Sequence, residues 1–481
     1  MNVPAASNST TDNSSSDALH VVIVGTGSAA FAAAIKSVEQ GATVTMIEGA
    51  NDIGGTCVNI GCVPSKIFIR GAHIAHLQGH HKVDGIPLNT PILNRKAMME
   101  QQQASVEKLR YEKYESILEN NPAVNLVRGM ARFKNATTLF VIKNDGSEIE
   151  IKADRILLAV GASASIPDIQ GLKDTPYWTS TEALITESIP EHLIVLGASV
   201  VALELAQAFR YTGARVTVIA RSTLLSKEDK EIGKALTTIL EDEGINVLLN
   251  TTTDSVAYNE NKFTIQTNNG EIQGDQVLVA TGRTSNSASL GLNTIGLKTN
   301  QRGDIIVDDH MRTNVKNIYA AGDCTNQPQF VYVAAAAGTR AARNMTGDDV
   351  AIDLSVMPAV VFTDPQVASV GLTEQEAQTQ GLVVESQTLD LENVPRAIAN
   401  MDTRGFIKLV AEQETSRIVG CQVLAAEGGE IIQTATLAVR NRMTINELAD
   451  QLFPYLTMVE GLKLTAQTFT KDVKQLSCCA G

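Results

Sequence analysis

Residues 19–48 read LHVVIVGTGSAAFAAAIKSVEQGATVTMIE and contain two short apolar runs separated by a glycine turn and an alanine-rich stretch. The first run, 19–24, is typical of a strand buried in a parallel sheet. A helix is predicted from the turn to residue 40, and a second strand at 42–47. This order is the sequence pattern of a βαβ unit.

The glycine turn carries the pattern G-x-G-x-x-A. Gly25 permits a tight turn, Gly27 lets a pyrophosphate approach the backbone, and Ala30 closes the pattern. Glu48 ends the second strand, where its carboxylate can accept hydrogen bonds from a ribose. The pattern alone is weak evidence. With the strands, helix and acid in order, it predicts a dinucleotide-binding unit.

The next feature is GGTCVNIGCVPSK at 54–66, in which Cys57 and Cys62 stand five positions apart. If a helix starts near Gly55, the two sulfurs can reach one side of its first turns. A helix N-terminus also stabilises a thiolate. Two unrelated buried cysteines are the usual explanation of such a spacing, but the preceding unit favours a redox-active pair.

A second dinucleotide unit is predicted from His192 onward, with a strand, the turn GASVVA at 197–202 and a strand at 215–219. Its candidate cofactor residues are Gly197, Ser199 and Glu204. Ala220 occupies the position that corresponds to the acid of the first unit, and Arg221 follows it. A guanidinium without the carboxylate favours a 2′-phosphate, so the sequence predicts NADPH rather than NADH.

Asp323 follows an apolar strand pattern at 318–322, at the end where a bound cofactor would lie. Two dinucleotide units imply two dinucleotides. With a dithiol between them, a flavin that links NADPH to sulfur is the simplest interpretation. From about residue 351 the pattern changes to mixed strands and amphipathic helices, which predicts a third domain and an association surface.

Composition limits the possible functions. The 481 residues are 44% hydrophobic and 19% charged, with a net charge of −14, which argues against nucleic acid or anionic membrane as a partner. No apolar run approaches the roughly 20 residues of a membrane span. Residues 1–18 contain no Lys or Arg and are predicted to be a disordered arm rather than a secretory signal. Six cysteines in so long a chain favour the reducing cytoplasm.

Four of the seven histidines follow the cysteine pair, at His73, His76, His80 and His81. Three of them share a helix face and could hold a metal. No acid or cysteine completes the set, which favours a solvated polar face instead.

The chain ends with Cys478-Cys479-Ala480-Gly481. Adjacent cysteines can form a strained disulfide or a pair of thiol ligands. An inert tail is the alternative, although exposed paired thiols invite oxidation. Cys324 and Cys421 fit no motif and are predicted to be ordinary buried cysteines.

The cysteine stretch, both glycine patterns and Ala-Gly-Asp at 321–323 together resemble the flavoprotein disulfide reductases, which include glutathione reductase and dihydrolipoamide dehydrogenase. The resemblance covers roughly residues 19–470. It implies an α/β protein with two Rossmann-like dinucleotide-binding domains and a C-terminal α+β dimerisation domain. The implied domains are FAD-binding at 19–185 and 284–350, NADPH-binding at 186–283, and dimerisation at 351–481 with the Cys-Cys tail.

The resemblance also implies roles for single residues. Cys62 would lie against the flavin, and Cys57 would exchange with substrate. Lys66 would lie near the reactive edge of the flavin, and Asp323 would bind the ribityl or phosphate part of FAD. The remaining residues implied at the FAD site are Gly55, Thr56, Ala131 and Val331.

One departure from the family selects a branch of it. Members that reduce organic disulfides carry a His-Pro pair and a Glu, whereas this sequence has Pro454-Tyr455 and Glu460. Tyr has a much higher ordinary pKa than His, which argues against organic disulfide reduction, because that reaction needs a base that protonates and deprotonates the leaving thiol. Tyr332, Tyr455 and the terminal cysteines instead resemble the branch that acts on mercuric ion.

In that branch Hg(II) is the substrate, Cys478 and Cys479 deliver it to Cys57 and Cys62, and the protein is a homodimer. Tyr332, Tyr455 and Glu460 are the other implied catalytic residues. An organic disulfide reductase is the first alternative, and a flavin-bearing protein that sequesters thiophilic ions without turnover is the second. Many members of the branch begin with a metallochaperone-like domain, and nothing before Leu19 resembles one.

Overall fold

The computed structural model describes residues 18–475, which form two compact units. The first unit contains residues 18–55, 113–161 and 285–352. The second contains residues 56–112, 162–284 and 353–475. The predicted N-terminal arm and the terminal cysteines lie outside the described residues, apart from position 18.

A seven-stranded sheet in the order β16-β6-β1-β2-β3-β4-β5 forms the first unit. Its first five strands are parallel, and β3, β4 and β5 form an antiparallel meander. The bounds are β1 His20–Val24, β2 Thr43–Glu48, β3 Val124–Asn135, β4 Thr138–Lys143, β5 Glu148–Lys152, β6 Arg155–Leu158 and β16 Ile318–Ala320.

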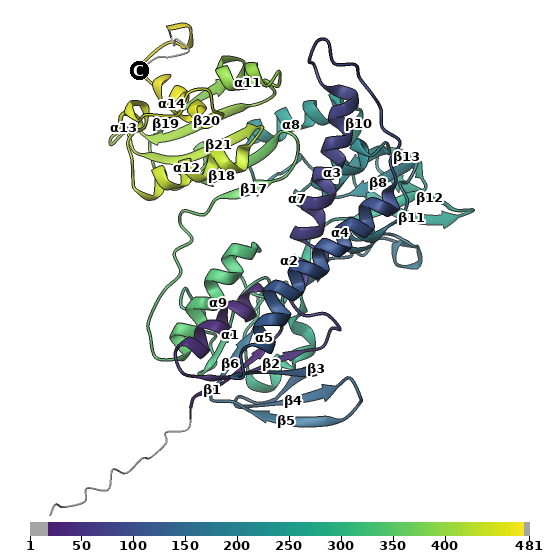
Figure 1. The fold of residues 1–481 in the computed structure, drawn as a ribbon, viewed down its shortest axis with the longest axis vertical. Helices are drawn as coiled ribbons and strands as arrows, with labels where there is room; N and C mark the ends of the chain where they lie inside the picture. The colour runs from purple at the N-terminus through teal and green to yellow at the C-terminus, as the bar shows by residue number, and fades with distance from the viewer. Residues whose placement is uncertain (1–17, 476–481) are drawn as a thin grey trace, which may run out of the picture. The chain divides into compact units, whose positions relative to one another are not determined.

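Helices α1 (Ser28–Glu39) and α9 (Val331–Met345) pack against each other in this unit (Figure 1). They approach closely because Gly338 has no side chain: a Cβ there would lie 2.1 Å from the carbonyl oxygen of Ala29. The short helix α5 (Ser116–Glu119) continues a π-helical turn at Tyr111–Glu115. Apolar residues of the parallel strands, including Val22, Ile156 and Leu158, form the core.

A four-stranded parallel sheet in the order β10-β9-β8-β14 lies in the second unit. Its strands are β8 His192–Leu196, β9 Arg215–Ile219, β10 Ile245–Leu248 and β14 Gln276–Val279. A three-stranded sheet adds β11 Thr253–Asn259, β12 Lys262–Thr267 and β13 Gly270–Gly274, and β7 Ala162–Ala164 pairs with β15 Arg283–Ser285. The helices of this part are α2 Gly55–Ile60, α3 Cys62–His80, α4 Arg95–Arg110, α6 Ser180–Ile185, α7 Val200–Tyr211 and α8 Lys230–Asp242.

The C-terminal part of the second unit is a five-stranded antiparallel sheet in the order β17-β18-β21-β20-β19. Its strands are β17 Ala359–Val361, β18 Gln366–Gly371, β19 Val384–Asp390, β20 Phe406–Glu412 and β21 Ile418–Ala425. The helices are α10 Glu374–Thr379, α11 Pro395–Ala399, α12 Gly428–Arg440, α13 Ile445–Asp450 and α14 Glu460–Gln467. Short 3₁₀ segments lie at Leu172–Asp174, Asn286–Leu290, Leu292–Ile295, Leu391–Asn393 and Val473–Gln475.

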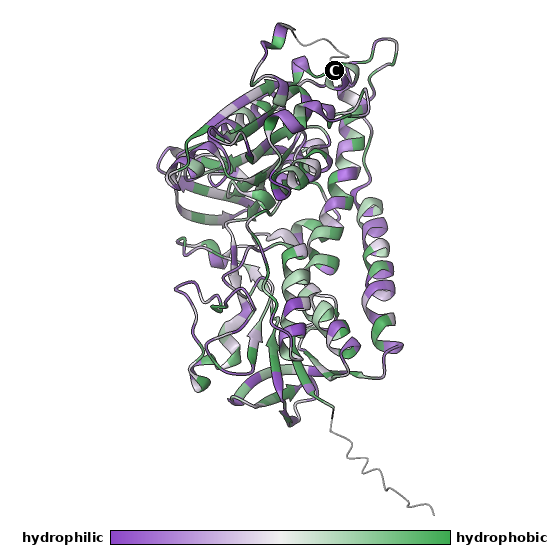
Figure 2. Cartoon of the chain, turned by 90° about the vertical axis from the view of Figure 1, so that its left-hand side faces the viewer, coloured by the Kyte–Doolittle hydropathy of each residue, from purple (hydrophilic) through white to green (hydrophobic). Residues whose placement is uncertain are grey.

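The predicted α/β fold class is confirmed. Figure 2 shows hydrophilic and hydrophobic residues alternating along the helices. This is the pattern expected for amphipathic helices that cover fully buried parallel strands such as β8 and β14. Within residues 18–475, no helix is both long and apolar enough to cross a bilayer. Cys324 and Cys421 are fully buried, as predicted.

Candidate active site

The first glycine turn joins β1 to α1 and leaves the backbone open. Gly25 has φ +111°, and a Cβ there would lie 2.3 Å from the carbonyl oxygen of Ala159. Gly27 precedes α1, and a Cβ on Gly55 would lie 2.7 Å from the Cα atom of Gly27. The bare backbone and the helix N-terminus make a place for a pyrophosphate. Ala30 is fully buried in the first turn of α1.

Glu48 ends β2 with its carboxylate held in place. One carboxylate oxygen accepts a hydrogen bond from Thr26 Oγ1 at 2.5 Å, and the other accepts one from the Ala50 N–H at 2.8 Å. The carboxylate therefore lies at the carboxyl edge of the parallel strands, where an adenosine ribose would bind.

Three other residues implied at the FAD site belong to the same unit. Asp323 follows β16 at the carboxyl end of that strand, Val331 begins α9, and Ala131 is buried in β3. An acid and a helix start thus accompany the glycine turn. These features fit a flavin dinucleotide with its phosphates against helix N-termini.

A cavity of about 340 Å³ lies in the first unit beside the start of α9. Tyr332 lines it, and burial raises the pKa of this tyrosine to about 12, so the phenol stays neutral. The cavity also contains two residues that the sequence analysis missed, Lys113 and Tyr114. They belong to the π-helical turn, which no hydrophobic periodicity reveals. The other lining residues are Ser28, Phe31, Val331 and Ala335.

The cysteine pair does not lie in one helix, as the spacing had suggested. Cys57 belongs to α2, and Cys62 is the first residue of α3. Gly61 separates the helices with φ −128° and ψ −112°, and a Cβ there would lie 2.8 Å from the carbonyl oxygen of Thr56. A second helix therefore starts at Cys62 and directs its N-terminal dipole at that sulfur.

The two sulfurs form a hydrogen-bonded pair with different acidity. The hydrogen bond from Cys57 and, to a smaller extent, the charge of Lys66 together lower the pKa of Cys62 to about 7, against the opposing effect of burial. The same hydrogen bond, together with burial, raises the pKa of Cys57. In the reduced pair Cys62 is therefore the thiolate and Cys57 the thiol. This is the asymmetry that a dithiol nucleophile requires.

Lys66 and Glu204 come from different sequence motifs and meet in the second unit. Lys66 Nζ donates to Glu204 Oε2 at 2.7 Å, and the Glu204 side chain is only 4% exposed. The other oxygen, Oε1, accepts a hydrogen bond from the backbone N–H of Phe362 at 2.9 Å. Both oxygens of Glu204 are thus engaged within the protein.

The second glycine turn repeats the geometry of the first. Gly197 has φ +127°, and a Cβ there would lie 2.3 Å from the carbonyl oxygen of Ala280. Ser199 is the N-cap residue of α7, and its side chain makes no capping hydrogen bond. At the end of β9, Ala220 is buried and Arg221 is exposed. This site offers a helix N-terminus and a guanidinium without a competing carboxylate, which fits NADPH.

Tyr455 and Glu460 lie before and at the start of α14. Tyr455 is 56% exposed, whereas Glu460 is 8% exposed and burial raises its pKa. Glu460 Oε2 has no hydrogen-bond partner among the described residues. Cys478 and Cys479, the predicted delivery ligands, lie outside the described residues.

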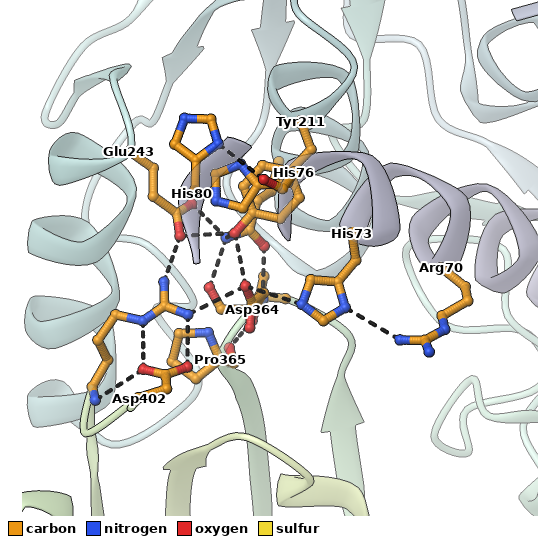
Figure 3. A network of polar contacts seen from close by, with 12 residues as sticks. Arg70, His73, His76, His80, Tyr211, Glu243, Asp364, Pro365 and Asp402 are labelled. Carbon is orange, nitrogen blue, oxygen red and sulfur yellow. Dashed lines mark hydrogen bonds and ion pairs between the residues drawn. The ribbon is translucent and has the colours of Figure 1, made fainter. Parts of the chain in front are cut away.

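The histidines of α3 lie on a partly exposed face, where their rings stack on one another and on Tyr211 (Figure 3). The His76 ring stacks on Tyr211 at 3.8 Å and on His80 at 4.1 Å, measured between ring centroids. His73 Nε2 lies 3.7 Å from Asp364. Burial lowers the pKa of His76 to about 4. His81 accepts a hydrogen bond from the Val83 N–H.

Within the part of the chain that the structure describes, the only cluster of three or more His, Cys, Asp or Glu side chains close enough to share a metal ion is Asp308, Asp309 and His310. The histidines of α3 do not form such a group. Their contacts instead connect α3 with α7 and with the loop at Asp364.

Comparison with known proteins identifies the family. The family model of pyridine nucleotide-disulphide oxidoreductases matches residues 19–338, and the model of their dimerisation domain matches residues 357–466. A mercuric reductase of Shigella flexneri is 60% identical over 97% of this chain and 84% of its own length. One from Shewanella putrefaciens is 58% identical over 96% of this chain and 83% of its own length.

A solved structure shows the same fold. The copper complex of the HOCl-induced flavoprotein disulfide reductase of Escherichia coli is 29% identical, with a TM-score of 0.85 over 95% of this chain and all of that chain. The chain therefore belongs to the mercuric reductases, within the pyridine nucleotide-disulphide oxidoreductase family.

Proposed function

We propose that this protein reduces Hg(II) to Hg(0) with electrons from NADPH, in mercury detoxification and resistance. The observation that carries the proposal is the hydrogen-bonded Cys57–Cys62 pair at the start of α3, with one sulfur a thiolate near neutral pH. Identity of 58–60% with mercuric reductases over nearly the whole chain supports this substrate.

The glycine turns assign the two cofactors. Gly25, Gly27, Glu48 and Asp323 would hold FAD, and Gly197, Ser199 and Arg221 would hold NADPH. When bound, FAD carries the two electrons of NADPH to sulfur. The corresponding domains are residues 19–185 with 284–350 for FAD, 186–283 for NADPH and 351–481 for dimerisation.

The cysteine pair binds the metal. Hg(II) is a soft cation that prefers two thiolates, so Cys62 binds first as the existing thiolate and Cys57 follows as it loses its proton. The reaction balances as NADPH plus Hg(II) giving NADP⁺, one proton and Hg(0). Because metal binding deprotonates Cys57, the pair must release that thiol proton each time it takes up the metal.

We also propose that the C-terminal cysteines deliver the metal. Cys478 and Cys479 would take Hg(II) from small thiols and pass it to Cys57 and Cys62 by ligand exchange, with the tail supplied by the partner subunit of a homodimer. The dimerisation module at 357–466 supports the homodimer. Tyr332, Tyr455 and Glu460 would line the route of the metal. The need for reduced thiols supports a reducing compartment, the cytoplasm, as the site of this chemistry.

The competing function is reduction of an organic disulfide. Comparing Hg(II) with excess small thiol, lipoamide and glutathione disulfide as oxidants of NADPH separates the two. Of the three oxidants, we expect only Hg(II) to support NADPH turnover. The turnover rate should fall in the double variant Cys478→Ala/Cys479→Ala. Cys421→Ala is the control, because Cys421 is buried in the hydrophobic cluster of the C-terminal sheet, which does not include the pair, and its loss should leave turnover unchanged. Turnover with an organic disulfide and inhibition by Hg(II) would favour the competing function.

A further inference from the structure

The ammonium of Lys66 has two defined contacts besides solvent. Lys66 lies one turn after Cys62 on α3, and its Nζ donates to the buried carboxylate of Glu204 at 2.7 Å. The same Nζ stands 4.5 Å from the centroid of the Phe362 ring. A cation at this distance from an aromatic face is attracted by the ring quadrupole. The side chain of Lys66 is 34% exposed, so solvent reaches it in addition to these two contacts.

Phe362 touches both members of this ion pair. Its ring contacts the ammonium of Lys66, and its backbone N–H donates to Glu204 Oε1 at 2.9 Å. A buried carboxylate is stable only when its counter-charge is accompanied by further hydrogen bonds. Phe362 supplies such a bond to Glu204 while it holds the counter-charge of Glu204 in place.

The loop that carries Phe362 is itself fixed. It joins β17 to β18 of the C-terminal sheet, and two residues later Asp364 is held by α7. The Asp364 N–H donates to Gln207 Oε1 at 2.7 Å, Gln207 Nε2 donates to the Asp364 carbonyl oxygen at 2.8 Å, and Tyr211 donates to the carboxylate at 2.9 Å (Figure 3). Glu204, Gln207 and Tyr211 share one face of α7, so a single helix face holds the loop.

We propose that Phe362 is a positioning residue of the redox centre: its ring and its N–H keep the Lys66 ammonium beside Cys62. A residue of the C-terminal sheet would then control the electrostatic environment of the redox helix. The proposal rests on the proposed redox role of the cysteine pair. It adds a residue that no sequence motif singled out.

A double-mutant cycle on the FAD-loaded enzyme tests the proposal. Phe362→Leu keeps an apolar side chain without a π face, and kcat with NADPH and Hg(II) should fall about three- to fivefold, the usual scale of such a contact. Phe362→Trp keeps the face and should stay within about twofold of the parent. In a Lys66→Met background, Phe362→Leu should cause no further loss, because the ring acts through Lys66. Phe140→Leu is the matched control, since its ring meets Lys134 at 5.1 Å in the other unit.

A second readout does not depend on turnover. In the NADPH-reduced enzyme at neutral pH, alkylation of Cys62 by iodoacetamide should slow about three- to fivefold in Phe362→Leu and not in Phe140→Leu. If Phe362→Leu fails to fold, a fluorinated phenylalanine at position 362 weakens the π face at nearly constant shape and takes its place.

Three outcomes decide the matter. The proposal would be overturned if Phe362→Leu had the kcat and the alkylation rate of the parent. It would also be overturned if Phe362→Leu lowered kcat by the same factor in the parent and in the Lys66→Met background. A parent enzyme that does not consume NADPH with Hg(II) would overturn the proposed function instead. The alkylation comparison would still test Phe362 in that case.

Discussion

The two sulfurs of the cysteine pair differ in acidity, and single residues cause the difference. Cys57 donates a hydrogen bond to Cys62, and Lys66 adds a positive charge one helical turn away. The sequence predicted the pair from its spacing and its place after a dinucleotide unit. It could not predict which sulfur ionises, because that depends on the helix break at Gly61 and on the direction of one hydrogen bond.

This asymmetry predicts a pH dependence. The pKa of Cys62 is lowered to about 7, so alkylation of Cys62 in the reduced, metal-free protein should accelerate as the pH rises through about 7 and then level off. Below that pH the sulfur is protonated and reacts slowly. Cys57→Ala removes the hydrogen bond that lowers the pKa, so its midpoint should move up toward the ordinary value of about 8.5. Peptide mass spectrometry reports both curves, and coincident midpoints would contradict the assignment.

Arg221 predicts the nucleotide preference. Loss of a charge-assisted contact to the 2′-phosphate in Arg221→Ala should lower kcat/KM for NADPH by roughly tenfold to a hundredfold and leave kcat/KM for NADH unchanged. Arg215→Ala is the control, because Arg215 is an exposed arginine at the start of the same strand. Equal losses with both nucleotides would show that Arg221 does not select the phosphate.

At the scale of elements, close helix packing depends on one glycine. Gly338→Ala would place a methyl group 2.1 Å from the carbonyl oxygen of Ala29 and push α9 away from α1, the helix that would hold the FAD phosphates. We expect loss of about 2 kcal/mol or more in unfolding free energy, and weaker FAD retention. In Gly429→Ala, a helical control with no contact under 3.4 Å, the change should be neutral or stabilising by up to about 1 kcal/mol. Denaturant unfolding followed by flavin fluorescence measures the unfolding free energy and the FAD retention of both variants. Equal changes in Gly338→Ala and Gly429→Ala would contradict the packing argument.

The contact between α3 and α7 makes a second prediction at this scale. The Tyr211 hydroxyl lies 2.8 Å from a carboxylate oxygen of Glu243 and 2.9 Å from one of Asp364, so its single proton serves one of them at a time, and the ring stacks on His76. Tyr211→Phe keeps the stack but leaves buried oxygens with fewer donors, which should cost about 1–3 kcal/mol of stability. Tyr258→Phe should cost almost nothing, since its hydroxyl makes one long, exposed contact of 3.4 Å. Thermal unfolding compares the two variants.

Local patterns predicted the elements better than the contacts between them. Strands such as β1, β8 and β9 were evident because buried parallel strands are continuous apolar runs bounded by glycine turns. The π-helical turn with Lys113 and Tyr114 was not, because it lies within one helical pattern. The contact between Lys66 and Phe362 joins segments almost 300 positions apart, and no local periodicity records it.

At the scale of the whole molecule, one chain combines two dinucleotide turns, a dithiol and a dimerisation module. The first unit contains the features that fit FAD, and the second contains the cysteine pair and the features that fit NADPH. For the assembled enzyme we therefore propose that electrons from NADPH reach Hg(II) only through Cys57 and Cys62.

The most direct test measures NADPH consumed and elemental mercury released in the same reaction, for the parent, Cys57→Ala and Cys62→Ala. We expect one Hg(0) for each NADPH in the parent, and loss of both activities in either variant while FAD and the fold are retained. Release of Hg(0) at the parent rate by either variant, or NADPH oxidation without mercury release by the parent, would contradict it.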